Sequence, residues 1–159
     1  MIEMRMAMKI IILEDNADRQ EAMRACLVDR FYQYEIHFFD DSAEMIRFLD
    51  EHLADAIVIA LDHDLDLKPG PEGRWIDPGT GREVADFLAE RAPTCPVILH
   101  TTNAPAAVGM EAVLRDAGWK TRRVVPFGDL EWIETAWFSA MRRAIVGPVS
   151  RNTCPGGHS

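Results

Sequence analysis

The segment that most constrains the fold is the apolar run from Ala56 to Leu61, which leads directly into Asp62-His63-Asp64. An uninterrupted apolar run of this length, rich in β-branched residues, is typical of a strand buried on both faces of a parallel sheet. In such sheets, ligands bind just beyond the carboxyl ends of the strands. We therefore expect a functional site here, although a polar strand exit that needs only water is the other interpretation.

Two further apolar runs, 9–13 and 96–99, also end in polar residues. If the three runs are neighbouring parallel strands, their polar exits meet at one edge of the sheet. The residues at this edge are then Glu14, Asp15, Asp62, His63, Asp64, His100, Thr101, Thr102 and Asn103.

Strand-like and helix-like segments alternate along the chain, with strands expected at 9–13, 34–39, 56–61, 96–99 and 121–125. A helix is expected after each strand, the last beginning at Asp129. This alternation predicts a three-layer α/β/α fold with a five-stranded parallel sheet. Right-handed crossovers leave few topologies, and we expect the flavodoxin-like strand order 2-1-3-4-5. We predict a single domain over 9–146, an N-terminal extension over 1–8 and a flexible C-terminal tail over 147–159.

The composition of the 159-residue chain argues against several classes of partner. A net charge of −9 disfavours non-specific binding to DNA, which needs clustered Lys and Arg. No apolar run is long enough to cross a membrane, and the N-terminus lacks the apolar core of a signal peptide. The three cysteines, Cys26, Cys95 and Cys154, form no disulfide framework. These features predict a cytoplasmic protein.

The acidic residues at the sheet edge predict a metal site. Two carboxylates about 4 Å apart repel by roughly 4 kcal/mol at an effective dielectric of 20, so a cluster of them needs neutralisation. A hard divalent cation provides it, and we expect Mg²⁺ or Mn²⁺ on Asp15 and Asp62, with Glu14 and Asp64 assisting. A raised pKa on one acid, or a merely solvated acidic rim, are the alternatives.

Two histidines at neighbouring strand ends, His63 and His100, form a candidate acid/base pair. Each could instead be a core histidine hydrogen-bonded to a neighbour. Thr101, Thr102 and Asn103 lie at the start of a helix, where their hydroxyl and amide groups could bind phosphate oxygens.

A long Pro/Gly-rich loop over 67–79 follows the central strand, and loops of this length in compact domains are often functional. We expect it to form a lid over the site. Its one large apolar residue, Trp75, either stacks on a substrate base or packs into the core as an anchor.

These residues resemble the receiver domains of two-component response regulators over nearly the whole domain. Glu14-Asp15 match the acidic pair after the first strand, Asp62 matches the phosphoacceptor and Thr101 the hydroxyl residue after the fourth strand. Gly81 resembles the residue that begins the receiver's third helix, and Pro126-Phe127 the proline segment after the last strand. However, Val125 stands where a receiver has the lysine that contacts the phosphoryl group.

The histidine-containing exits, Asp62-His63-Asp64-Leu65 and His100-Thr101-Thr102-Asn103, are similar to those of a divergent branch, the cyclic-phosphate-processing receiver-like family. This resemblance implies metal-assisted processing of cyclic phosphates in RNA or nucleotides, by a cyclic phosphodiesterase-type hydrolase. His63, His100 and Asp62 are then the catalytic candidates. Two alternatives stay open. The chain could be a stand-alone receiver phosphorylated on Asp62, or a degenerate receiver that binds a protein partner through its last strands and helices.

Overall fold

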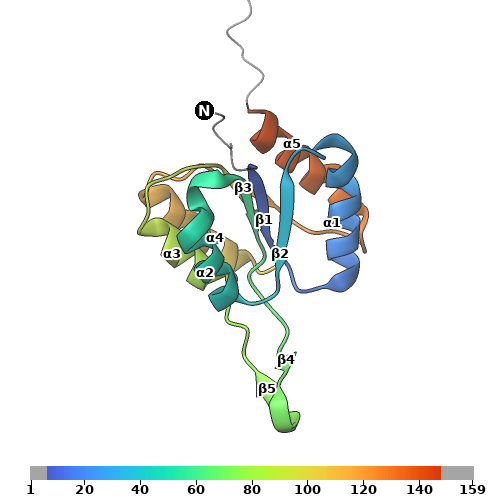
Figure 1. The fold of residues 1–159 in the computed structure, drawn as a ribbon, viewed down its shortest axis with the longest axis vertical. Coiled ribbons are helices and arrows are strands. Elements are labelled where there is room, and N and C mark those ends of the chain that lie inside the picture. Colours follow the sequence, from blue (N-terminus) through green and yellow to red (C-terminus); the bar gives the residue numbers. More distant parts are fainter. Residues whose placement is uncertain (1–6, 148–159) are drawn as a thin grey trace, which may run out of the picture.

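The computed structural model describes residues 7–147 and contains the predicted parallel sheet (Figure 1). The strand order is β2-β1-β3-β6-β7, which confirms the flavodoxin-like order, with β2 and β7 at the edges. The strands are β1 (Lys9–Leu13), β2 (Glu35–Phe39), β3 (Ala56–Leu61), β6 (Val97–His100) and β7 (Thr121–Val124).

Five α-helices cover the two faces of the sheet, α1 and α5 on one face and α2, α3 and α4 on the other (Figure 1). Polar side chains fix where three of them begin: Asn16, Asp41 and Asn103 each accept a hydrogen bond from the first turn of the helix that follows. The helices are α1 (Ala17–Arg30), α2 (Ser42–His52), α3 (Gly81–Ala89), α4 (Ala104–Asp116) and α5 (Phe138–Val146).

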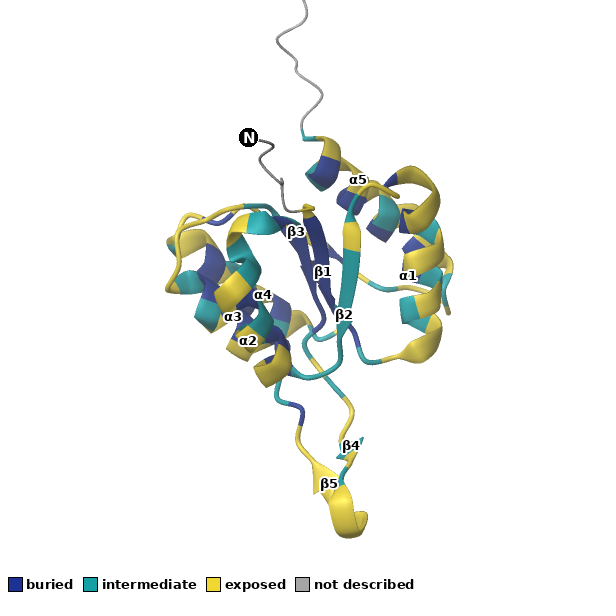
Figure 2. Ribbon diagram, in the orientation of Figure 1, coloured by how far each residue is buried: buried dark blue, intermediate teal, exposed yellow. Residues whose placement is uncertain are grey.

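The core consists of two apolar layers, one on each side of the sheet. Strands β1 and β3 are buried almost throughout, because helices cover both of their faces (Figure 2). Alternate residues feed the two layers: Ile12 and Ala60 belong to the layer under α1 and α5, whereas Leu13 and Leu61 belong to the layer under α2, α3 and α4. This alternation decides the direction of the polar residues at the strand ends.

The segment predicted as a long loop contains a two-stranded antiparallel hairpin, β4 (Lys68–Pro69) and β5 (Trp75–Ile76). It extends outward from the carboxyl edge of the sheet and does not lie across that edge as the expected lid would (Figure 1). Its base is closed where the Gly81 N–H donates to the His63 carbonyl at 2.9 Å. A Cβ at Gly81 would lie 1.9 Å from the Asp62 carbonyl oxygen, so only glycine allows this close approach.

The C-terminal helical region contains a π-helical segment, Ile133–Trp137, directly before α5. In it the Phe138 N–H donates to the Ile133 carbonyl, the five-residue spacing that defines a π-turn. A regular helix pattern beginning at Asp129 does not predict this irregularity.

No helix in residues 7–147 is long and apolar enough to span a membrane. The predicted N-terminal extension lies outside the described residues except for Ala7 and Met8, and the predicted tail lies outside them except for Gly147.

Candidate functional site

Strand register brings one residue from each of three strands into the same position at the carboxyl edge. Leu13 pairs with Leu61, and Leu61 pairs with Leu99, so these three leucines form one row across the sheet. All three point into the layer under α2, α3 and α4. Because successive side chains alternate between faces, the next residue on each strand points toward α1 and α5. Those residues are Glu14, Asp62 and His100.

These three side chains form a buried cluster. Glu14 and His100 are fully buried and Asp62 is 6% exposed. The His100 Nε2 lies 3.3 Å from the Glu14 Oε1. One potential ligand atom from each of the three residues lies within 4.8 Å of the others. The cluster is therefore compact enough for all three to bind one metal ion.

Arg19, from the first turn of α1, is the cationic neighbour of this cluster. Its Nη1 lies 3.6 Å from the Glu14 Oε1 and 3.8 Å from the Asp62 Oδ2. The guanidinium also stacks over the Trp132 ring at 5.2 Å. Arg19 thus offsets part of the charge repulsion between the two acids.

Two tryptophans form the inner wall of the cluster. The His100 ring centroid lies 5.8 Å from Trp132 and 6.2 Å from Trp137, and both tryptophans are fully buried. Trp132 directly precedes the π-helical segment and Trp137 is its last residue, and the five-residue spacing of a π-turn places residues of this separation on one side of the helix. This wall separates His100 from solvent.

The electrostatics of the two acids differ. Burial raises the pKa of Asp62 to about 6, with the neighbouring Glu14 carboxylate adding to the shift. Burial also acts to raise the pKa of Glu14, but His100, the Asn16 N–H and Arg19 outweigh it and lower that pKa. Without a bound cation, the negative charge is therefore better stabilised on Glu14 than on Asp62.

The cluster leaves buried polar atoms without a hydrogen bond, although the Glu14 Oε1 lies within ion-pair distance of His100 and Arg19. Among the described residues, the Glu14 Oε1 and both ring nitrogens of His100 make no hydrogen bond. Such atoms are costly when buried, and a bound ion would satisfy them. Two carboxylates and an imidazole also match the ligand preferences of divalent cations such as Mn²⁺. The residues present therefore fit a metal ion.

A second carboxylate–histidine pair lies at the solvent-facing rim of the same edge. The His63 Nδ1 is 2.9 Å from the Asp64 Oδ1, and the Asn103 Nδ2 donates to the Asp64 Oδ2 at 3.2 Å. The Asp64 side chain is 67% exposed, whereas that of His63 is 17% exposed. This chain of contacts orients the imidazole and leaves the His63 Nε2 free of protein partners among the described residues.

The predicted phosphate-binding residues are largely engaged within the protein. The Thr101 hydroxyl accepts from the Asn103 N–H at 3.1 Å, and the Asn103 Oδ1 accepts from the Ala106 N–H at 3.1 Å. Pro105 lacks an N–H, which removes another donor from the start of α4. Thr102 is exposed and forms no hydrogen bond among the described residues. Asn103 thus has a clear structural role in orienting Asp64.

Other predicted site residues are not part of the buried cluster, although Asp15 borders it beside Glu14. Asp15 is half-buried and accepts a hydrogen bond from the Asp66 N–H; burial and the charge of Glu14 raise its pKa. Trp75 is 68% exposed on the hairpin, so the interpretation in which it packs into the core is wrong. Val125, at the position of the receiver lysine, is 59% exposed.

Sequence reasoning missed Arg19, Trp132 and Trp137. A signal existed for Arg19, because a cation in the first turn of a helix opposes the helix dipole and so suggests a role outside the helix. The approach of the two tryptophans to His100 depends on the π-turn, which no regular helix pattern predicts.

Solved receiver structures share this fold. The phosphorylated cyanobacterial phytochrome response regulator RcpA matches with a TM-score of 0.64 at 17% identity, over 89% of this chain and 96% of that one. The Mn²⁺-bound form of the response regulator Rcp1 gives 0.64 at 16% identity, over 90% and 97%. A receiver domain from Rhodospirillum rubrum gives 0.58 at 17% identity, over 83% and 89%.

A comparison with curated proteins finds no match. The sequence model of the cyclic-phosphate processing receiver domain matches residues 9–116, which span β1 through α4. This range contains Glu14, Asp62 and His100 but neither Trp132 nor Trp137. With the receiver topology and the histidine-containing strand ends in place, the chain belongs to the cyclic-phosphate processing receiver domain family.

Proposed function

We propose that this protein is a divalent-metal-dependent enzyme that acts on a cyclic phosphate at an RNA end or in a nucleotide. The observation that carries the proposal is the buried Glu14–Asp62–His100 cluster, whose ligand atoms include several without a hydrogen bond, together with the His63–Asp64–Asn103 chain at the solvent-facing rim. The family name supports the substrate class.

In this proposal Glu14, Asp62 and His100 hold the ion. When bound, Mg²⁺ or Mn²⁺ supplies charge neutralisation at phosphate oxygens and lowers the pKa of a coordinated water. The full burial of His100, between Glu14 and two tryptophans, favours a ligand role for it over direct proton transfer to substrate. This differs from the carboxylate-only site that the sequence suggested on Asp15 and Asp62 with Glu14 and Asp64, because His100 replaces Asp15 and Asp64 as a ligand.

His63 is the residue best suited to move a proton. Asp64 occupies its Nδ1, so the Nε2 is the atom that faces a reactant. The carboxylate of Asp64 stabilises the imidazolium that forms when the Nε2 accepts a proton, and Asn103 holds that carboxylate in place. Opening a cyclic phosphate by water requires one proton to leave the attacking water and one to reach the departing ribose oxygen, which a single histidine can perform in sequence.

The direct test is incubation of the protein with 2′,3′-cyclic nucleotides and RNA ending in a 2′,3′-cyclic phosphate. We expect ring opening in Mg²⁺ or Mn²⁺ that stops in EDTA. Absence of turnover across the panel, with either metal, would contradict the proposal.

The alternative is a receiver phosphorylated on Asp62. Val125 in place of the receiver lysine disfavours it, because no cation from that position can stabilise the phosphoryl group. Acetyl phosphate with Mg²⁺ should therefore give no stoichiometric adduct by intact-mass measurement. A long-lived adduct on Asp62 would favour the signalling function instead.

A further inference from the structure

A cavity of about 640 Å³ lies between β7 and α5, at the opposite end of the sheet from the buried Glu14–Asp62–His100 cluster. It is lined by Pro96 and Ile98 at the start of β6 and by Lys120, Thr121 and Arg122 at the start of β7. These are the amino ends of the strands, whereas Glu14, Asp62 and His100 lie at the carboxyl ends. The cavity volume is within the range of small-ligand sites, roughly 300–1,000 Å³.

Two features of the sequence leave this cavity open: a charged residue on the inner face of β7 and small residues on the facing surface of α5. Arg122 pairs with Ile98 and lies two residues before Val124, so alternation places it on the sheet face that packs against α5. An apolar residue there would fill the space, but Arg122 is exposed. The opposing surface of α5 presents the small residues Ser139, Ala140 and Ala144, which leave the gap open.

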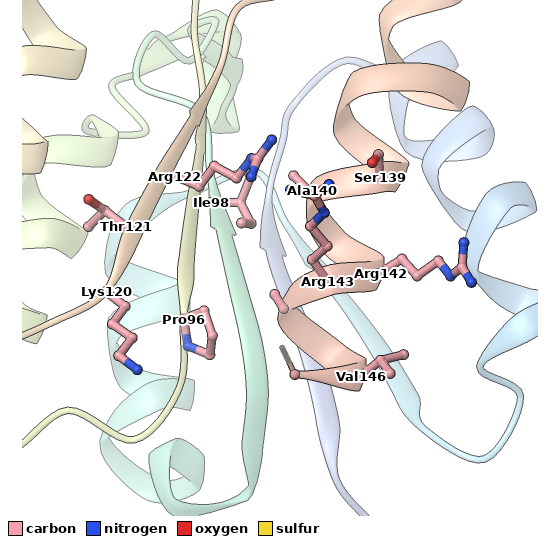
Figure 3. A pocket seen from close by; sticks show the side chains of 12 residues that line it. Pro96, Ile98, Lys120, Thr121, Arg122, Ser139, Ala140, Arg142, Arg143 and Val146 are labelled. Carbon is pink, nitrogen blue, oxygen red and sulfur yellow. The ribbon is translucent and has the colours of Figure 1, made fainter. Parts of the chain in front are cut away.

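The lining is strongly cationic in a chain whose net charge is −9. It includes Lys120, Arg122, Arg142 and Arg143, and none of the four forms an ion pair within the part of the chain that the structure describes. Figure 3 shows Arg122 and Arg143 extending from β7 and from α5 into the space between them. One carboxylate, that of Glu111, contacts a lining residue of the cavity: it accepts a hydrogen bond from the Thr121 hydroxyl at 3.4 Å. Glu111 also forms an ion pair with Arg115 at 3.6 Å, which offsets its negative charge.

The remaining lining is apolar, with Pro96, Ile98, Ala140, Ala144 and Val146. A ligand that fits must therefore combine anionic groups with an apolar or planar part. Guanidinium groups bind phosphate oxygens through two parallel hydrogen bonds, and two of them facing one space suit adjacent phosphates. The overall negative charge disfavours a long polyanion, which would experience repulsion beyond the cavity.

We propose that this cavity is a second, separate site for a small nucleotide that carries at least two phosphates. Arg122 and Arg143 bind the phosphates, Lys120 adds charge at the rim, and the base packs against Pro96 and Ala144, which line the cavity and are partly exposed. The site is independent of the metal cluster and of the reaction proposed there.

The test is calorimetric titration of the full chain with ADP, AMP, adenosine and inorganic pyrophosphate in EDTA, which removes any contribution from a metal site. We expect ADP to bind more tightly than AMP, pyrophosphate to compete with it, and adenosine to bind weakest. Arg122→Glu and Arg143→Glu should each weaken ADP binding at least tenfold, without a change in melting temperature, because both side chains are exposed.

Two control variants make the result specific. Arg47→Glu makes the same charge change on an exposed residue of α2 that is outside the cavity, and should change ADP affinity less than twofold. Asp62→Asn should leave ADP binding intact. Absence of ADP and pyrophosphate binding at millimolar concentration, or equal losses in Arg47→Glu and Arg122→Glu, would overturn the proposal. So would loss of binding in Asp62→Asn alone, or tighter binding of a single-stranded RNA than of ADP.

Discussion

The site contains two carboxylate–histidine pairs that share their chemistry and differ in their surroundings. Glu14 and His100 lie 3.3 Å apart and are both fully buried. Asp64 and His63 lie 2.9 Å apart, with their side chains 67% and 17% exposed. Burial removes water as a partner, so the inner pair retains unsatisfied ligand atoms, whereas the outer pair can exchange protons with solvent and substrate. In the proposed function, this difference in exposure, more than residue type, assigns metal binding to the inner pair and proton transfer to the outer pair.

The largest effect should come from breaking the inner pair. Glu14→Gln or His100→Gln should abolish the rise in melting temperature that Mg²⁺ or Mn²⁺ produces, and should lower turnover about a thousandfold or more, because the metal's charge stabilisation is lost. Thermal melts with and without metal measure the first effect. Glu35→Gln is the matched control, since Glu35 forms an exposed pair with His37 on β2. Wild-type metal stabilisation in either inner variant would contradict the assignment.

Breaking the outer pair should separate catalysis from metal binding. His63→Gln should reduce the rate by roughly 10²–10⁴, the usual range for one proton-transfer group, while metal-dependent stabilisation stays intact. Asp64→Asn should cause a smaller loss, because it disturbs only the orientation and charge of His63. His37→Gln serves as the control for an exposed histidine outside the site. An unchanged rate per folded molecule in His63→Gln would refute the role of the outer pair.

The inner site should also make stability depend on pH when metal is absent. The pKa of Asp62 is about 6 in the folded state and 3.8 in its ordinary range, so the folded protein binds a proton more tightly between these values. The stability associated with that proton is present below about pH 4 and is lost as pH rises through 6, by about 3 kcal/mol. Glu14, whose pKa is lowered, acts in the opposite direction and loses its contribution as pH falls.

We therefore expect Asp62→Asn to raise the free energy of unfolding in EDTA at pH 7.5, by up to about 3 kcal/mol, and to change it little at pH 4. Urea denaturation at both pH values measures this. Asp50→Asn, which breaks an exposed ion pair with Arg91, should shift stability by less than about 1 kcal/mol. A loss of stability in Asp62→Asn at pH 7.5 would show that burial of this carboxylate carries no cost.

The smallest effect on stability should come from the hairpin. Trp75→Ala should change the free energy of unfolding by no more than about 0.5 kcal/mol, because the ring is 68% exposed. If the indole stacks on a substrate base, KM should rise by a factor corresponding to roughly 1–3 kcal/mol with kcat unchanged. Leu67→Ala, which removes another exposed apolar side chain from the 67–79 segment, is the control. An unchanged KM would remove Trp75 from substrate binding.

The pattern of apolar runs and polar strand exits is sufficient to predict the sheet and the edge at which the candidate site lies. Apolar runs such as Ile10–Leu13 and Ala56–Leu61 can be buried on both faces only in a parallel sheet covered by helices, so strand order and polar exits followed from the pattern. Once the register of the strands is known, the alternation of side chains along each strand also gives the sheet face to which each residue points.

The set of polar residues that come into contact depends on strand register and on contacts between distant segments. The pairing of Leu61 with Leu13 and with Leu99 aligns Glu14, Asp62 and His100, and a one-residue slip in the register of a strand would reverse the face of its polar residue. The tryptophan wall depends on a π-turn, and the hairpin depends on closure between Asp64 and Thr80. These features arise from contacts between segments that are distant in the sequence, and local sequence patterns do not predict the energies of such contacts.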